Sequence, residues 1–238
     1  MRLTLYVFAT FLLAGCTIEN EESTLKVDHV NIWVQNPKYG KEKLEGIGFT
    51  SIPDSLCKVH AGQGTTGRYF YFLNAYLELI FIHNEEEFQR NVERNRKLDF
   101  VERANSPQNG FSPFSVALKM ADYDKESIPF ETVEYQQEWM GESNRIFAAR
   151  NSKFNKVEPS LFVVYPEIEY DTFESMEDLS IIPEEYSMWR EFYKHKNGAE
   201  KISKIRIHSN EVNHKSETVK MLKAIKEIEL VEGEAYLM

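Results

Sequence analysis

Three residues in the first third of the chain could do chemistry together: His29, His60 and Glu78. Side-chain alternation in the apolar run 76–82 places Glu78 in the middle of a predicted strand, with apolar neighbours on both faces. A carboxylate is costly to bury there unless a cation or strong hydrogen-bond donors face it. The sequence therefore predicts that another part of the chain supplies a partner for Glu78.

His29 lies in a second predicted strand, residues 26–34, where one face also carries Val27, Asn31 and Trp33. An imidazole and a carboxylate inside a sheet could bind a metal or the polar part of a substrate. They could equally form a hydrogen bond that only fixes the sheet. His60 follows later, in a turn rich in glycine and threonine, where it either contacts a ligand or caps the loop.

The turn at residues 62–67 spells GxGxxG, the pattern of a dinucleotide-binding loop. That loop must open a helix, whereas residues 69–73 read as a strand, so we assign these glycines to the mouth of a cavity instead. Arg68 could hold an anionic substrate or pair with nearby acids on the surface. The chain has no GxSxG, CxxC or HExxH motif, so nothing supports a serine hydrolase, a thiol redox protein or a zinc protease.

The elements that position these residues follow a strand and helix pattern. Residues 26–82 read as strand, short helix, strand and β-hairpin, that is, a βαβββ unit. Asn84 and Glu87 have the spacing of a capping box at the start of the next helix. Further helices are predicted at 85–98, 183–193 and 213–225, and further strands at 114–120, 130–135, 145–150, 161–165, 202–208 and 228–231.

A weak internal repeat links the two ends of the chain. The apolar spacing of Val27, Val30 and Ile32 recurs in Ile202, Ile205 and Ile207, and a helix and another extended run follow both segments. This repetition predicts duplicated modules. Residues 167–180 are acidic and are predicted to form a loop.

The first residues carry a processing signal. Arg2 precedes the apolar run 3–13, which suits a signal peptide and is too short to span a bilayer. The following Leu-Ala-Gly-Cys resembles the bacterial lipobox, which predicts a signal peptide at 1–15 and a lipid on Cys16. Residues 16–25 then read as an acidic tether, and a protein built in this way would be anchored to the cell envelope. Cys57 remains as one free thiol and is read as a small buried hydrophobe.

The amino-acid composition limits the classes of protein to which this chain can belong. The 238 residues are 42% hydrophobic and 13% aromatic, which suits a chain that buries a sizeable core. The formal charge is −10, and removing the first fifteen residues takes away only Arg2, so the mature chain would carry 27 − 38 = −11. This acidic balance argues against a nucleic-acid partner and gives no electrostatic attraction to anionic lipid.

Several short motifs together resemble the vicinal oxygen chelate superfamily and, within it, the glyoxalase-like domains. They are Asp-His-Val at 28–30, Gly-Phe at 48–49, His60 followed by Gly-Thr at 64–65, Tyr-Leu-Glu-Leu at 76–79, and His-Lys-Asn-Gly-Ala at 195–199. The resemblance implies an α+β fold in which βαβββ modules form a curved mixed sheet around a cavity. It places one glyoxalase-like domain at 26–238, with a first module at 26–82. A divergent second module and an extra strand–helix unit would occupy 111–238.

The resemblance also implies a site. A His on the first strand and a Glu on the last strand of a module bind a divalent cation in metal-dependent members, and these positions match His29 and Glu78. Fe, Mn, Ni or Zn would suit such ligands, with His60 or Glu167 completing the set, and Glu78 would move a proton. The second module departs from the family pattern, because its comparable strands offer Ser115 or Val116 and Val164 or Tyr165 in place of the second His and Glu.

Three functions follow from the resemblance. The first is a metal-dependent lyase, isomerase or dioxygenase that acts on a small oxygenated molecule, with Trp33, Arg68 and Tyr76 as substrate contacts. The second is a metal-free module that holds a small ligand in the same cavity, lined by Trp33, Tyr69, Tyr71 and Tyr76. The third is a structural envelope lipoprotein. The missing second pair of ligands favours the last two, and pairing of modules within one chain or across a homodimer stays open.

Overall fold

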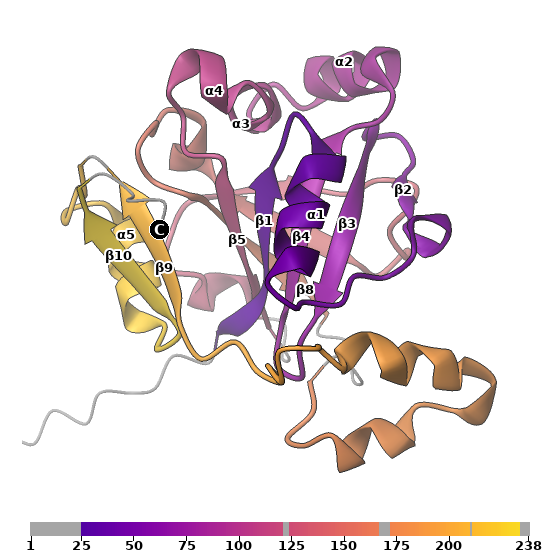
Figure 1. Ribbon diagram of the computed structural model, residues 1–238. Helices are drawn as coiled ribbons and strands as arrows, with labels where there is room; N and C mark the ends of the chain where they lie inside the picture. Colours follow the sequence, from indigo (N-terminus) through magenta and orange to yellow (C-terminus); the bar gives the residue numbers. More distant parts are fainter. Residues whose placement is uncertain (1–24, 121–123, 167–171, 210, 234–238) are drawn as a thin grey trace, which may run out of the picture.

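Eight strands form one curled mixed sheet in the order β2-β3-β4-β1-β5-β8-β7-β6 (Figure 1). The computed structural model describes residues 25–120, 124–166, 172–209 and 211–233. The strands of this sheet are β1 (Lys26–Trp33), β2 (Val59–His60), β3 (Thr65–Tyr71), β4 (Tyr76–Ile82), β5 (Phe114–Lys119), β6 (Thr132–Tyr135), β7 (Arg145–Ala149) and β8 (Ser160–Tyr165). The predicted fold class, α+β with a curved mixed sheet, is confirmed.

The sheet consists of two halves that repeat one topology. Strand β1 runs parallel to β4, β5 runs parallel to β8, and β1 and β5 pair antiparallel at the centre. An approximate two-fold axis therefore passes through the β1–β5 pair. The second module consists of β5–β8, so the sequence echo at residues 202–207 does not mark it.

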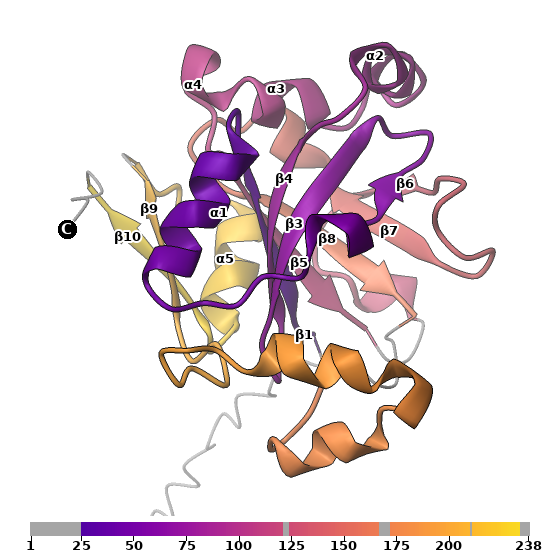
Figure 2. The same ribbon diagram turned by 45° about the vertical axis from the view of Figure 1, so that its right-hand side comes forward.

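That echo belongs to a separate βαβ unit. Strands β9 (Ile205–Ser209) and β10 (Ile228–Glu232) pair in parallel as a small second sheet, and α5 (Glu217–Ala224) connects them. Met221 and Leu222 of α5 belong to the same apolar core as Val116 and Leu118 of β5. Figure 2 shows α1 (Pro37–Gly46) over the first half of the sheet and α5 behind it. The C-terminal unit thus covers the outer face of the second module.

Alternation along the strands divides the sheet into two faces. The outer face is apolar and carries, for example, Val30 of β1, Leu79 of β4 and Val116 of β5, all of which are buried. The inner, concave face carries His29, Asn31 and Trp33 of β1. Because the outer side chains must meet α1 and α5, the register that buries them also fixes which residues point inward.

Short helices surround the sheet. They are α2 (Glu85–Arg94), α3 (Phe100–Ala104) and α4 (Ser106–Asn109), with 3-10 helices η1 (Asp54–Leu56), η2 (Lys125–Ser127), η3 (Arg150–Lys153), η4 (Glu177–Ile181) and η5 (Glu184–Tyr193). Asn84 caps α2 by accepting a hydrogen bond from the Glu87 backbone N–H at 3.1 Å. The helix predicted at 183–193 is a 3-10 helix, and the one predicted at 85–98 ends at Arg94, where the Asn95 side chain bonds back to Asn91.

The predicted signal peptide, Cys16, the beginning of the acidic tether and Glu167 lie outside the described residues. Within the described ranges, no helix has the length and apolar character needed to cross a bilayer.

One buried arginine ties the α3 region to the second module. Arg103 is 1% exposed, and all five of its guanidinium N–H groups donate hydrogen bonds. The acceptors are the Asp99 carboxylate at 2.7 Å and the backbone carbonyls of Ser112, Ser152, Asn155 and Glu158 at 2.8–3.1 Å. Since these carbonyls come from separate loops, Arg103 holds in place the segments that lead into β5 and β8.

We therefore expect Arg103→Met to lower the free energy of unfolding by about 3–5 kcal/mol, because it leaves the partly buried Asp99 carboxylate and four carbonyls without their donor. Urea denaturation of the two proteins measures this loss. The matched change Arg206→Met removes an arginine from an exposed ion pair with Glu229 on β9 and β10, and should change the stability little. Equal losses in the two variants would contradict this role of Arg103.

Candidate functional site

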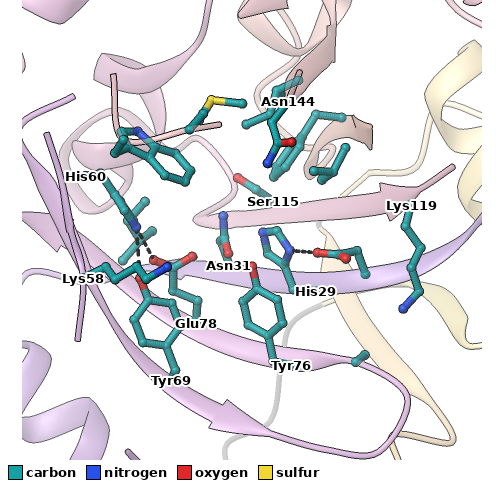
Figure 3. A pocket seen from close by; sticks show the side chains of 18 of the residues that line it. His29, Asn31, Lys58, His60, Tyr69, Tyr76, Glu78, Ser115, Lys119 and Asn144 are labelled. Atoms are coloured by element: carbon teal, nitrogen blue, oxygen red, sulfur yellow. Dashed lines mark hydrogen bonds and ion pairs between the residues drawn. The ribbon is translucent and has the colours of Figure 1, made fainter. Parts of the chain in front are cut away.

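The concave face of the sheet encloses a cavity of about 590 Å³ (Figure 3). Its walls are largely aromatic and apolar, with Trp33, Tyr69, Tyr71, Tyr76, Phe100, Tyr135, Trp139, Phe162, Trp189 and Tyr193 among the lining residues. Polar side chains gather on the module-one side, where β1 and β4 run next to each other. The predicted cavity is therefore present and combines an apolar wall with a polar floor, the usual construction of a small-molecule site.

Glu78 lies on this floor and is 4% exposed. The register pairs it with Asn31 of β1, so the two side chains emerge side by side. Glu78 Oε1 has no hydrogen-bond partner among the described residues. Gly67 on β3 makes room for the carboxylate, since a Cβ at that position would overlap Oε1 and lie 2.8 Å from Glu78 Cγ.

His60 is the nearest imidazole to Glu78, with 3.7 Å between Nε2 and Oε1. Its two ring nitrogens are already engaged, Nδ1 with Thr65 Oγ1 and Nε2 with Tyr69 Oη, both at 2.9 Å. Trp139 lies against the ring, with 4.8 Å between centroids. Burial lowers the pKa of His60 despite the negative charge of Glu78, so the ring is neutral at pH 7.

His29 occupies the other side of Asn31 from Glu78 (Figure 3). The Asp28 carboxylate accepts a hydrogen bond from Nδ1, which leaves Nε2 without a protein partner among the described residues. The ring stacks on Tyr76, with 4.3 Å between centroids, and meets the edge of Phe162 at 5.6 Å. These contacts hold the ring on the cavity wall.

Of the predicted substrate contacts, Trp33 and Tyr76 line the cavity and Arg68 does not. Arg68 follows Gly67 and precedes Tyr69, which faces inward, so alternation turns its guanidinium to the outer face. There it pairs with Asp54 at 3.1 Å and lies over the ring of Phe81. The structure therefore shows the surface ion pair, one of the two alternatives for Arg68, and does not place this residue on the cavity wall.

Some residues that line the site were not predicted from the sequence. Strict alternation places Asp28 on the outer face, but a register irregularity between Val27 and His29 brings it to the cavity. Lys119 of β5 also reaches the wall, where its ammonium bonds to Thr172. Trp139 comes from a segment far along the chain, and no local pattern marks it as part of this site. Trp189 also lines the cavity, and it belongs to the aromatic helix predicted at 183–193.

The approximate two-fold axis shows what stands in place of a second ligand pair. Pairing of His29 with Ala117 and of Asn31 with Ser115 makes Ser115 the symmetry mate of His29. The same axis relates Asn31 to Ala117. Because Asn31 pairs with Glu78 and Ala117 pairs with Phe162, Phe162 is the symmetry mate of Glu78. The residue that replaces the second carboxylate is thus Phe162, and not Val164 or Tyr165.

A divalent metal fits these residues poorly. Phe162 has no donor atom and Ser115 offers a weak one, and both ring nitrogens of His60 are occupied by neighbouring hydroxyls. In the part of the chain that the structure describes, no three His, Cys, Asp or Glu side chains are grouped as a metal would require. The roles predicted for His29, His60 and Glu78 as metal ligands, and for Glu78 in proton transfer, stay predictions.

The chain belongs to the glyoxalase-like domain family, whose model matches residues 27–224. The fold is also similar to a methylmalonyl-CoA epimerase in complex with methylmalonyl-CoA and NH4+, at 15% identity and a TM-score of 0.41, over 62% of this chain and 98% of the epimerase. A hypothetical protein from Bacillus halodurans C-125 matches at 9% identity and a TM-score of 0.41, over 61% of this chain and 96% of the other.

A hypothetical protein from Staphylococcus aureus matches at 16% identity and a TM-score of 0.43, over 84% of this chain and 75% of the other. No curated protein shows significant sequence similarity to the chain.

The buried neutral histidines predict a pH dependence of stability. Burial also lowers the pKa of His195, whose Nδ1 accepts a hydrogen bond from the Thr50 backbone N–H at 2.8 Å. In the unfolded chain both rings titrate near 6.5, so the unfolded state binds more protons below that pH. Stability that is complete above pH 6.5 should therefore decline as the pH falls towards the folded-state pKa values.

Urea denaturation between pH 7.5 and about 5.5 measures this decline, and His60→Gln should make it shallower because glutamine does not titrate in this range. His208→Gln, at an exposed position on β9, serves as the control and should keep the parent slope. A His60→Gln protein with an unchanged slope would contradict the assignment of a neutral, buried His60.

Proposed function

We propose that this protein binds a small molecule with an oxygen- or nitrogen-bearing polar end in the cavity of its glyoxalase-like domain, without a metal ion, and that a lipid on Cys16 anchors it to the bacterial envelope. One observation carries the binding proposal: the curled sheet encloses a cavity of about 590 Å³ whose floor on β1 and β4 carries His29, Asn31 and Glu78. A cavity of this size suits a ligand of modest mass.

The composition of the walls supports a ligand with an apolar body. Phe162 and Val164 of β8 and Ile146 of β7 face the floor from the second module. Burying an apolar group against them is favourable by about 25 cal/mol for each Å² removed from water. The polar floor adds direction, because hydrogen bonds to Asn31 and Glu78 fix which end of the ligand lies there.

The binding proposal predicts that the full-length chain, purified in detergent from cells that make it, carries a small molecule in near-stoichiometric amount. Native mass spectrometry detects the complex, and chromatography of the denatured sample identifies the molecule. Gly67→Ala should lower the occupancy by about tenfold or more, because the new Cβ displaces the Glu78 carboxylate without removing any side chain of the site. Gly46→Ala on α1, where a Cβ meets nothing within 4 Å, is the control.

Two results would contradict this proposal, and each would favour a different function. Near-stoichiometric metal in elemental analysis, lost in His29→Ala or Glu78→Ala, would support the metal-dependent enzyme. A chain that carries neither metal nor small molecule would support the structural lipoprotein.

The anchor rests on the lipobox-like Leu-Ala-Gly-Cys and on the short apolar run before it. In cells fed an alkyne-tagged palmitate, the parent chain should take up the label and sediment with membranes. Cys16→Ser should lose the label, whereas Cys57→Ser should keep it because Cys57 lies within the folded domain. A labelled Cys16→Ser protein, or an unlabelled parent, would contradict the anchor.

A further inference from the structure

The Glu78 carboxylate has no cation beside it. Within the described residues, no lysine or arginine lies at ion-pair distance from Glu78, and His60 is the basic group at such a distance, at 3.7 Å. Arg68, one strand away, points to the outer face and pairs with Asp54. Lys58 is exposed and lines the cavity without an ion pair to Glu78, and Lys119 bonds to Thr172 beyond His29. A carboxylate that is 4% exposed is costly to hold in this state.

The groups around Glu78 do not neutralise it. Burial lowers the pKa of His60, so this ring carries no positive charge at pH 7. Burial and the Glu78 charge raise the pKa of Tyr69, so its hydroxyl stays protonated and neutral. The floor of the cavity therefore holds a buried carboxylate that no lysine or arginine of the described residues contacts.

The two polar side chains next to Glu78 also have unused hydrogen-bonding capacity. Asn31 is 7% exposed, and its side chain makes no hydrogen bond to any residue in the described ranges; its Oδ1 is buried without a partner. His29 donates from Nδ1 to Asp28, so in the neutral ring Nε2 is an acceptor. Figure 3 shows Asn31 between His29 and Glu78, so the three groups form a row along the floor.

We propose that this row binds the ammonium group of the ligand, so that the ligand class is a small primary amine with an apolar or aromatic body. This inference rests on the proposed function and names the chemistry of the bound molecule. An ammonium group has three N–H donors and one positive charge. It can bond to the Glu78 carboxylate, to the Asn31 amide oxygen and to His29 Nε2, and it supplies the missing cation.

The surrounding rings strengthen this assignment. Tyr76 lies 6.1 Å from Tyr69 and 5.6 Å from Tyr71 between ring centroids, and it also stacks on His29. The face of an aromatic ring attracts a desolvated cation, whereas it offers an anion no favourable electrostatic contact. An anionic ligand would bring a second negative charge to Glu78, and a neutral ligand would leave that carboxylate unpaired.

The test uses the full-length chain in a nonionic detergent at pH 7.5 and three matched probes: 2-phenylethylamine, 2-phenylethanol and phenylacetate. They share one aromatic body and differ in the charge of the polar end. Isothermal titration calorimetry should show that the amine binds at least about tenfold more tightly than the alcohol, and that phenylacetate binds most weakly. Glu78→Gln should weaken amine binding by about tenfold and leave the alcohol within about threefold, because the amide keeps the shape and removes the charge.

Glu229→Gln, on the exposed face of β10, serves as the charge-matched control and should bind all three probes as the parent does. Tighter binding of the alcohol or of phenylacetate than of the amine would overturn the ammonium assignment alone. Failure of all three probes to bind would overturn the assignment together with the proposed function. Tight binding of Zn²⁺ or Mn²⁺ that is lost in Glu78→Gln would show that the floor takes a metal instead.

Discussion

The pairing of β1 with its two neighbours is the constraint on which the rest of the structure depends. Strand β1 is bonded to β4 on one side and to β5 on the other, and its outer face lies in the apolar core. A slip of one residue would bring Val30 into the cavity and turn His29 and Asn31 into the core. The same burial that stabilises the sheet therefore holds the polar floor in register, and the site needs no separate scaffold.

The two modules share a topology but have diverged in chemistry. Ser115 and Phe162 occupy the positions that correspond to His29 and Glu78, so an imidazole faces a hydroxyl and a carboxylate faces a phenyl ring across the two-fold axis. The outer face has diverged as well, because α5 of the C-terminal βαβ unit packs where the second module would otherwise place its own helix. Unequal side chains at symmetry-related positions can give a bound molecule a defined orientation.

The sequence was sufficient for those parts of the structure that depend on local periodicity. Alternation placed His29 and Glu78 on inward faces, and the Asn84 cap and the strands β1 and β4 followed from short-range pattern. It failed where distant segments decide the outcome. The irregularity at Asp28 depends on pairing with β5, Trp139 reaches His60 across the sheet, and Phe162 is identified as the mate of Glu78 only by strand register. The face of β3 on which the Arg68 side chain lies could not be predicted from the sequence, because alternation gives the face of Arg68 only once the face of Tyr69 is known.

The electrostatics of the floor follow from burial rather than from any single contact. Burial raises the pKa of Tyr71 and Tyr76, as it does that of Tyr69, so each of these phenols stays neutral, and His60 stays neutral for the opposite reason. The carboxylate of Glu78 consequently faces neutral groups in a medium that screens charge less than water does. The chain as a whole carries a formal charge of −10, so the long-range field and the local site favour the same sign of ligand. In this protein, the proposed recognition of a cation rests on the buried Glu78 carboxylate, which no lysine or arginine of the described residues contacts.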